Sequence, residues 1–192
     1  QSRLGARSAV NPWTGQQAVA TTYSDSSVIA LRCGVKRDDM DPARYPGAIF
    51  FGDGVYVAND EVNPTTRLNN ASYRRMTISA AYQATPTGTT VQGQPAIMAW
   101  RTLDPNAVFS FVDAPNDGRF YVASKARDLG NGQWRYDYAV YNLNSNNAAA
   151  SVTIPLSPGV RTSNPTFYDI AITSENYATT DWNNSRNGCG IS

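Results

Sequence analysis

The chain has 192 residues, 41% of them hydrophobic, and its 16 basic residues almost balance its 15 acidic ones. Because the net charge is so small, the protein has no electrostatic field that would attract a polyanion or a membrane surface. We therefore expect no nucleic acid partner. No apolar run approaches the roughly 20 residues that cross a bilayer, so we expect no membrane insertion. The sequence contains no histidine, which excludes a Ser-His-Asp or Cys-His nucleophile and the usual zinc and iron sites.

The composition favours strands over helices. Helix surfaces are rich in Lys and Glu, but this chain has only two of each. It is rich instead in Asn, Thr, Ser, Tyr, Val, Gly and Pro, which are typical of strands and turns. We therefore predict an all-β fold, an antiparallel two-sheet β-sandwich of about nine to ten strands with little or no helix.

Residues 1–24 show no sustained periodicity, and we interpret them as an extended N-terminal arm. The arm either lies over its own domain or adds to the open sheet edge of a neighbouring subunit. Residues 27–33 predict a buried strand that ends at Cys33. We expect Cys33 to form a disulfide bond with Cys189 in an oxidising compartment, and the alternative is two separate buried thiols.

Three carboxylates follow within four residues, at Asp38, Asp39 and Asp41. Loops rich in such oxygens can bind Ca²⁺, so these residues are candidate metal ligands. The glycine and the later glutamate of an EF-hand loop are missing, and four basic residues lie nearby. The alternative is therefore a solvated loop whose aspartates pair with arginine.

The next stretch predicts further strands and two glycosylation sites. Residues 48–51 and 55–58 predict a hairpin that turns at Gly52-Asp53-Gly54, and residues 73–82 alternate with a period of two. Residues 96–101 and 107–112 predict two more strands. Asn70 and Asn183 each begin an Asn-x-Ser sequon, which matters only in a host that glycosylates.

The strongest local signal is Gly130-Asn131-Gly132, which lies between two long runs of aromatic and β-branched residues. Such a turn predicts a central β-hairpin. With Gly130 and Asn131 as the loop, one face of the hairpin carries the opposed pairs Arg127/Trp134, Lys125/Tyr136, Ala123/Tyr138 and Tyr121/Val140.

Neither face of this hairpin is purely polar. One face is expected to meet a second sheet, and the other a covering loop, a ligand or another chain. The candidate binding residues are Trp134, Tyr136, Tyr138, Tyr121 and Arg127. Such aromatic side chains serve as core, as a subunit contact or as a platform that stacks on sugar rings.

Catalysis by a pair of carboxylates, as in a glycosidase, is the enzymatic mechanism left open. Asp137 on the central hairpin is the most plausible catalytic carboxylate. The other interpretation of Asp137 is a cross-strand hydrogen bond to Ser124 or an ion pair with arginine. Residues 151–154 and 166–173 predict the last strands, and residues 179–192 form a polar tail. No composition break marks a second domain, so residues 1–192 are expected to form one domain, cut from a longer precursor.

Several segments resemble an uncharacterised family of secreted bacterial β-rich proteins with a motif like DLGNGxWxYxYAVxNLNS. They are GNGQWRYDYAVYNLNSNNAAASVTIPL, LDP and NNASYRRMTI, together with QSRLGARSAVNPWTG, DMDP and NPTFYDI. Those proteins are exported, are longer at both ends and commonly carry surface-sorting or dockerin-like tails. The resemblance implies an extracellular module of a larger protein and supplies no catalytic residues. Family members tend to have histidine in several matching places, and this chain has none.

These observations favour a non-catalytic, extracellular structural or assembly module of a secreted or cell-surface protein, which associates with other protein subunits through sheet edges and aromatic faces. The alternative is a carbohydrate-binding module with an aromatic platform, and a carboxylate-dependent glycoside hydrolase ranks third. We expect no cofactor other than the Ca²⁺ of the aspartate-rich loop.

Overall fold

A computed structural model describes residues 9–17, 34–61, 63–168, 180, 182–187 and 190–191. Most of the predicted arm, the strand at 27–33 and both cysteines, Cys33 and Cys189, lie outside the described residues. Within them the chain is mostly β and antiparallel, with short helical segments, which confirms the predicted fold class in this coarser form.

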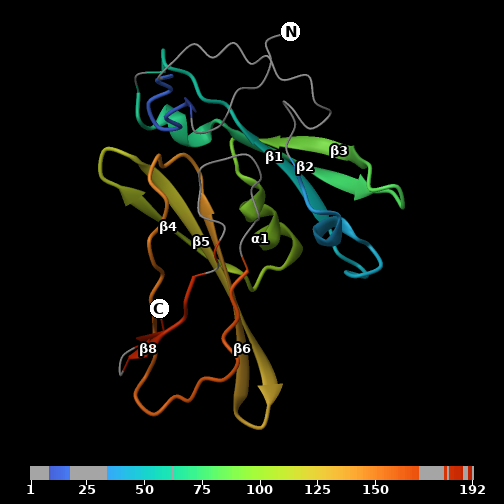
Figure 1. The fold of residues 1–192 in the computed structure, drawn as a ribbon, viewed down its shortest axis with the longest axis vertical. Helices are drawn as coiled ribbons and strands as arrows, with labels where there is room; N and C mark the ends of the chain where they lie inside the picture. Colours follow the sequence, from blue (N-terminus) through green and yellow to red (C-terminus); the bar gives the residue numbers. More distant parts are fainter. Residues whose placement is uncertain are drawn as a thin grey trace.

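Two three-stranded antiparallel sheets hold all the long strands (Figure 1). The first sheet has the order β1 (Phe50–Val55), β2 (Ala71–Ile78), β3 (Ala84–Gln92). The second has the order β4 (Val108–Ala114), β5 (Gly118–Gly130), β6 (Gln133–Asn142). The short strands β7 (Ile154–Pro155), β8 (Arg186–Asn187) and β9 (Gly190–Ile191) form a third small sheet. Only six strands of the described residues exceed two residues, fewer than the nine or ten predicted.

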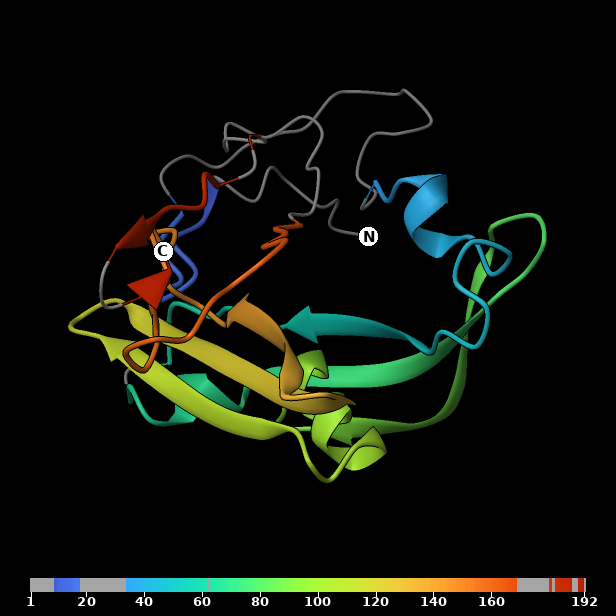
Figure 2. The same ribbon diagram turned by 90° about the horizontal axis from the view of Figure 1, so that it is seen from below.

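The helical segments are short and lie in the connections. Three are 3₁₀ turns, η2 (Arg37–Met40), η3 (Thr66–Asn69) and η4 (Ala96–Met98), and η4 leads directly into α1 (Ala99–Leu103). Viewed from the end where the β5–β6 hairpin has its tip, α1 is seen beside the strands of both sheets (Figure 2). The described part of the chain contains no helix with the length and apolar character needed to cross a membrane.

The segment at 96–101, predicted as a strand, is instead η4 and the start of α1. A short apolar run cannot be distinguished from a buried helical turn by its periodicity. The fully buried Pro95 begins the turn, and Ala99 is buried where the segment packs near the first sheet. The helix ends where the amide of Asp104 bonds to the carbonyl of Trp100 at 2.8 Å.

Gly52-Asp53-Gly54 is not the predicted turn, because β1 runs straight through it. Each residue of β1 pairs with one of β2, from Phe50 opposite Met76 to Val55 opposite Ala71. The Asp53 carboxylate instead accepts bonds from two distant segments, the Ala96 amide at 2.5 Å and the Tyr141 hydroxyl at 3.0 Å. Asp53 therefore ties the first sheet both to η4 and to β6.

Strand β3 is absent from the sequence prediction, since Pro86 and Gly88 interrupt its Thr-rich run. The strand lies at the edge of the first sheet, where proline is tolerated because its missing N–H faces away from the ladder. The predicted strand at 151–154 is reduced to β7, and the described part of 166–173, residues 166–168, is not a strand.

Buried apolar side chains are few and mostly small within the described residues. They are Ala71, Tyr73, Pro95, Ala99, Ala107, Ala123 and Leu143. Phe51 packs edge-on against Tyr73 with ring centroids 5.6 Å apart. None of these buried residues lies in the outer half of the β5–β6 hairpin.

Candidate binding surface on the β5–β6 hairpin

The hairpin turn uses Asn131 and Gly132, one residue later than predicted. Both residues have positive φ, 53° and 73°, as a type I′ turn requires. Gly130, also at positive φ (80°), pairs with Gln133, and a bulge between Asp128 and Gly130 absorbs the extra residue. The predicted loop of Gly130 and Asn131 is therefore wrong by one position.

This shift changes which side chains share a face, because neighbouring residues of a strand point to opposite sides. Trp134 lies opposite Asp128, Tyr136 opposite Ala126 and Tyr138 opposite Ser124. The predicted partners Tyr121 and Arg127 instead lie opposite Tyr141 and Arg135, on the other face. The five predicted binding residues are thus divided, three on one face and two on the other.

The outer part of the hairpin stands apart from the rest of the sheet. Strand β4 pairs with β5 only as far as Ser124, which lies opposite Val108. Residues 125–137 continue beyond this point as a two-stranded ribbon that extends away from the first sheet (Figure 1). Isolated two-stranded ribbons are only marginally stable in water, so the stability of this ribbon depends on what its side chains contact.

The face that carries Trp134, Tyr136 and Tyr138 is exposed. These side chains are 53%, 57% and 42% accessible, so the interpretation of them as core does not fit the structure. The rings of Tyr136 and Tyr138 lie 6.5 Å apart and only 18° from parallel. Partial burial, together with the neighbouring Tyr136, raises the pKa of the Tyr138 hydroxyl. We call these three residues the aromatic face.

Exposed aliphatic side chains continue the aromatic face toward the base of the sheet. Val140 lies opposite Val122 on the same side. On β4, Val108 lies opposite Ser124 and Val112 opposite Phe120, which places both valines on this side as well. Val108, Val112 and Val140 are all at least 40% exposed. The apolar surface therefore extends across the three strands of the sheet.

The opposite face of the ribbon is charged. The ammonium of Lys125 pairs with the carboxylate of Asp104 at the end of α1, and both side chains are half-buried. The Nε of Arg135 donates to Oδ1 of Asp137 at 2.9 Å, so Asp137 has the arginine partner of its non-catalytic interpretation. Arg127 and Arg135, two like charges, lie directly opposite each other.

The base of the hairpin is held by a polar network that sequence reasoning missed. The buried carboxylate of Asp117 accepts bonds from the Ser145 hydroxyl, the Asn146 amide at 2.7 Å and the Asn147 side chain at 3.0 Å. Burial alone would raise the pKa of Asp117, but these hydrogen bonds outweigh it and hold the pKa below its usual value. The run of Asn and Ser directly after an aromatic strand was the available signal.

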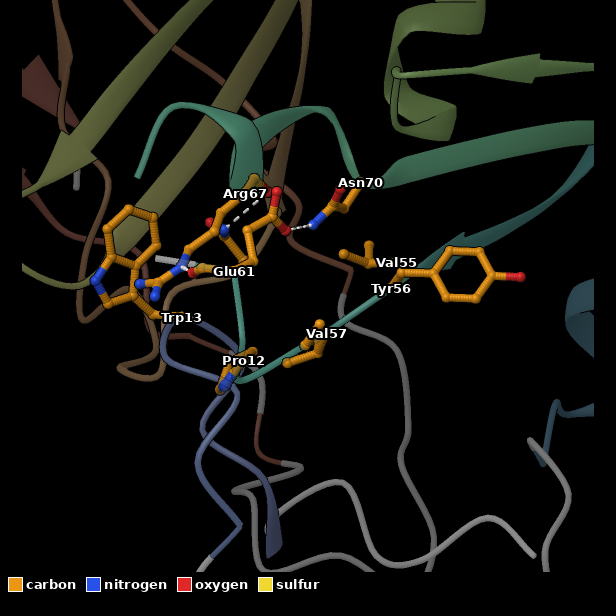
Figure 3. Close-up of a pocket in the computed structure, with 10 residues that line it drawn as sticks. Pro12, Trp13, Val55, Tyr56, Val57, Glu61, Arg67 and Asn70 are labelled. Atoms are coloured by element: carbon orange, nitrogen blue, oxygen red, sulfur yellow. Dashed lines mark hydrogen bonds between the residues drawn. The ribbon is translucent and has the colours of Figure 1, made fainter. Parts of the chain in front are cut away.

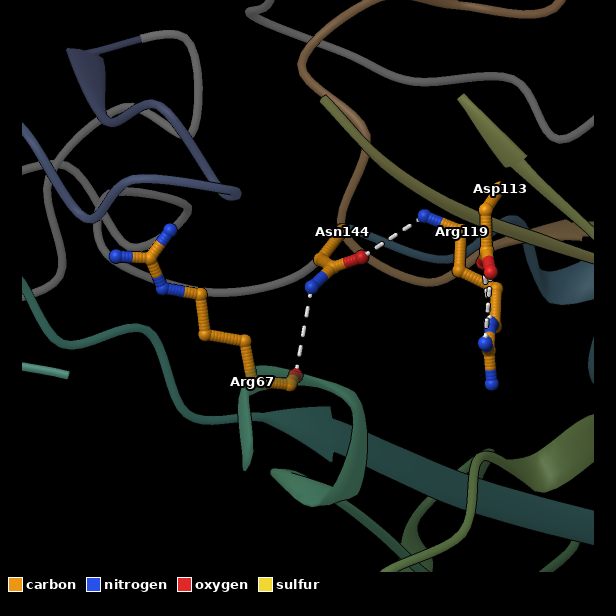
Figure 4. A network of polar contacts seen from close by, with 4 residues as sticks. All are labelled: Arg67, Asp113, Arg119 and Asn144. Carbon is orange, nitrogen blue, oxygen red and sulfur yellow. Dashed lines mark hydrogen bonds and ion pairs between the residues drawn. The ribbon is translucent and has the colours of Figure 1, made fainter. Parts of the chain in front are cut away.

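Asn144 extends this network to η3, in the connection between β1 and β2 of the first sheet (Figure 4). Its side chain accepts from the Arg119 amide at 3.1 Å and donates to the Arg67 carbonyl at 3.4 Å. Arg119 in turn forms a bidentate ion pair with Asp113 on β4, at 2.6 and 2.9 Å, which lowers the pKa of the Asp113 carboxyl. The Asn142–Asn147 loop therefore fixes the hairpin to its surroundings through side-chain amides.

The three aspartates of the predicted calcium loop have separate partners. Asp38 pairs with Arg44 at 3.0 Å, Asp39 accepts from the Tyr168 hydroxyl at 2.5 Å, and Asp41 accepts from the amide of Ala43 at 2.9 Å. No group of three or more potential metal-ligating side chains occurs among the described residues. The pairing of Asp38 with arginine matches the solvated-loop interpretation.

A shallow pocket lies between the segment at Trp13 and the end of β1 (Figure 3). It encloses about 210 Å³ including open solvent, less than the roughly 300–1,000 Å³ of small-molecule sites. Three of the polar residues that line it already bond to one another. Arg67 Nε donates to the Glu61 carbonyl at 2.7 Å, and the side-chain nitrogen of Asn70, the atom that a glycan would occupy, donates to the Glu61 carboxylate. Asn183, the other predicted glycosylation site, is exposed.

No family model, curated protein or solved structure matches this chain.

Proposed function

We propose that the chain is a non-catalytic structural or assembly module of a secreted or cell-surface protein, and that the aromatic face of the β5–β6 hairpin is its contact with other protein subunits. The observation that carries this proposal is the half-exposed state of Trp134, Tyr136 and Tyr138 on a protruding ribbon. Aromatic side chains are enriched in protein interfaces, and a buried one contributes roughly 1.5–3 kcal/mol.

The same proposal accounts for the second layer of the predicted sandwich. The β4–β6 sheet has an apolar side that the described residues leave largely open. A partner seated on this side would supply the second layer that a sheet with an apolar face requires. An extracellular location would also favour the predicted bond between Cys33 and Cys189, which a free-thiol assay under denaturing conditions tests.

Light scattering after size-exclusion chromatography, together with electron microscopy, tests the assembly role. We expect the wild-type chain to form oligomers or fibres and Trp134→Ala to reduce them. Tyr56→Ala is the matched control, because Tyr56 is 82% exposed and lies outside the hairpin. A wild-type chain that stays monomeric at all concentrations would refute the assembly role.

The second candidate is a carbohydrate-binding module, and the near-parallel rings of Tyr136 and Tyr138 favour it. Two exposed rings in nearly one orientation offer a flat surface on which sugar rings stack. This function predicts a monomer whose tryptophan fluorescence changes with one member of an oligosaccharide panel. The change should be lost in Tyr136→Ala and retained in Tyr56→Ala.

A further inference from the structure

Strand β6 forms an open edge of the second sheet. Over residues 133–140 its backbone hydrogen bonds go to β5, and no other described segment bonds to its outer side. Natural edge strands are usually protected by charged side chains, above all lysine, by proline or by a bulge on the edge itself. Proline occurs in β3, but β6 contains neither proline nor lysine, and the bulge of the hairpin lies on β5. The charged side chains of β6, Arg135 and Asp137, have opposite signs and pair with each other, so they do not repel a second strand that offers the same two charges in reverse order.

The sequence of β6 is complementary to itself when read in the antiparallel direction. We propose that β6 pairs with β6 of a second copy of this chain, about a twofold axis at Tyr136, to form one continuous six-stranded sheet. This inference rests on the assembly function proposed above and adds to it a contact through the sheet edge, with a stated partner and register. Tyr136 then faces Tyr136 of the second copy, and residues 133–139 form the ladder.

Charge complementarity selects this register. Arg135 lies opposite Asp137 of the second copy, and by symmetry Asp137 lies opposite its Arg135. Within one chain Arg135 has the like charge of Arg127 directly opposite on β5, which is unfavourable. The second copy places a carboxylate on the other side of Arg135, which adds to the contact that Arg135 already makes with Asp137 of its own chain.

Other registers lose this match. A twofold axis at Asp137 would place the two Asp137 carboxylates opposite each other, and an axis at Arg135 would do the same with two guanidinium groups. A shift of the pairing by a single residue would place the aromatic face of one copy and the charged face of the other on the same side of the joined sheet. The axis at Tyr136 therefore avoids like-charge pairs and keeps both faces continuous.

The aromatic face is completed in the same arrangement. Trp134 lies opposite Tyr138 of the second copy, and the two Tyr136 rings meet at the axis. Cross-strand aromatic pairs of this kind stabilise antiparallel sheets. Six aromatic side chains, three from each copy, then form one continuous row on the same side of the sheet.

Complementary charge reversal tests the pairing. Arg135→Asp gives a chain with aspartate at both positions, and Asp137→Arg gives a chain with arginine at both. We expect either variant alone to dimerise at least roughly tenfold more weakly in analytical ultracentrifugation, because symmetry places each like-charge contact twice in the dimer. An equimolar mixture of the two variants should regain association as a heterodimer, and the double variant should regain it as a homodimer. Arg101→Asp, an exposed change of equal charge on α1, is the control.

The outcomes separate this inference from the function on which it rests. A wild-type chain that is monomeric at every concentration would overturn both. An oligomer that survives Arg135→Asp and Asp137→Arg but is lost in Trp134→Ala would overturn the β6 pairing alone. Loss of association in both single variants without recovery in their mixture would also overturn it. Circular dichroism of each variant establishes that the fold is retained.

Discussion

Removal of the Asp117 carboxylate should destabilise the whole hairpin, because this group holds the loop that follows β6. In Asp117→Ala, the Ser145 hydroxyl keeps a second acceptor, the Asn147 carbonyl at 2.7 Å. The Asn147 amide, which also donates to Asp117 at 3.3 Å, keeps the Ser145 hydroxyl oxygen as an acceptor at 3.2 Å. The Asn146 amide and the Asn147 side chain lose the acceptor that they have in the described structure. Two hydrogen bonds to a buried charged group, at about 1.5 kcal/mol each, give an expected loss of about 3 kcal/mol in the free energy of unfolding.

Urea unfolding followed by tryptophan fluorescence measures this loss. Asp117→Asn keeps one acceptor oxygen and should lose about 1 kcal/mol, and Asp60→Ala, an exposed aspartate, serves as the control. The folded-state pKa of Asp117 is lowered, so its contribution is present above the unfolded pKa and disappears as the pH falls through the folded value. The difference between the wild type and Asp117→Asn should therefore shrink below about pH 4. A loss in Asp117→Ala no larger than that in Asp60→Ala would refute the reasoning.

Three further results are expected. A Cβ at Gly118 would lie 2.5 Å from the Ser145 amide nitrogen, so Gly118→Ala should cost about 1–3 kcal/mol, whereas Gly54→Ala, with no neighbour within 4 Å, should be nearly neutral in the same urea assay. Hydrogen bonding to Asp39 raises the pKa of Tyr168 to about 12, so Tyr168→Phe should remove the highest-pH step of an ultraviolet tyrosine titration. The contribution of this contact to stability should persist below about pH 10 and be lost as the pH rises toward 12. Trp134→Ala should change thermal stability by less than about 1 kcal/mol, since the ring is half exposed, and a larger loss would show that it supports the fold.

The location of the central hairpin could be predicted from the sequence, but its register could not. Gly130, Asn131 and Gly132 all tolerate positive φ, so two different two-residue loops satisfy the same local rule. The choice depends on the bulge after Asp128, which places Gly130 opposite Gln133. This one-residue difference moved Tyr121 and Arg127 to the face opposite Trp134.

The remaining differences also have tertiary causes. The apolar run at 96–101 fits a strand or a helical turn, and its packing beside the first sheet decides for the turn. Gly52 and Gly54 indicate a hairpin locally, but pairing with β2 keeps β1 extended through both. The aromatic residues of the hairpin could be named as candidates because strands rich in tyrosine and tryptophan stand out in any sequence. Their exposure depends on where β4 ends, at the pair Val108/Ser124, and the sequence carries no local sign of that boundary.

Asp53 has a mechanical consequence. Its carboxylate receives the Tyr141 hydroxyl near the base of the hairpin and the amide of Ala96 at the start of η4. Any displacement of the hairpin relative to the first sheet therefore stretches these two hydrogen bonds. The position of one sheet relative to the other depends in part on a single carboxylate, whereas each sheet is held internally by ladders of backbone hydrogen bonds.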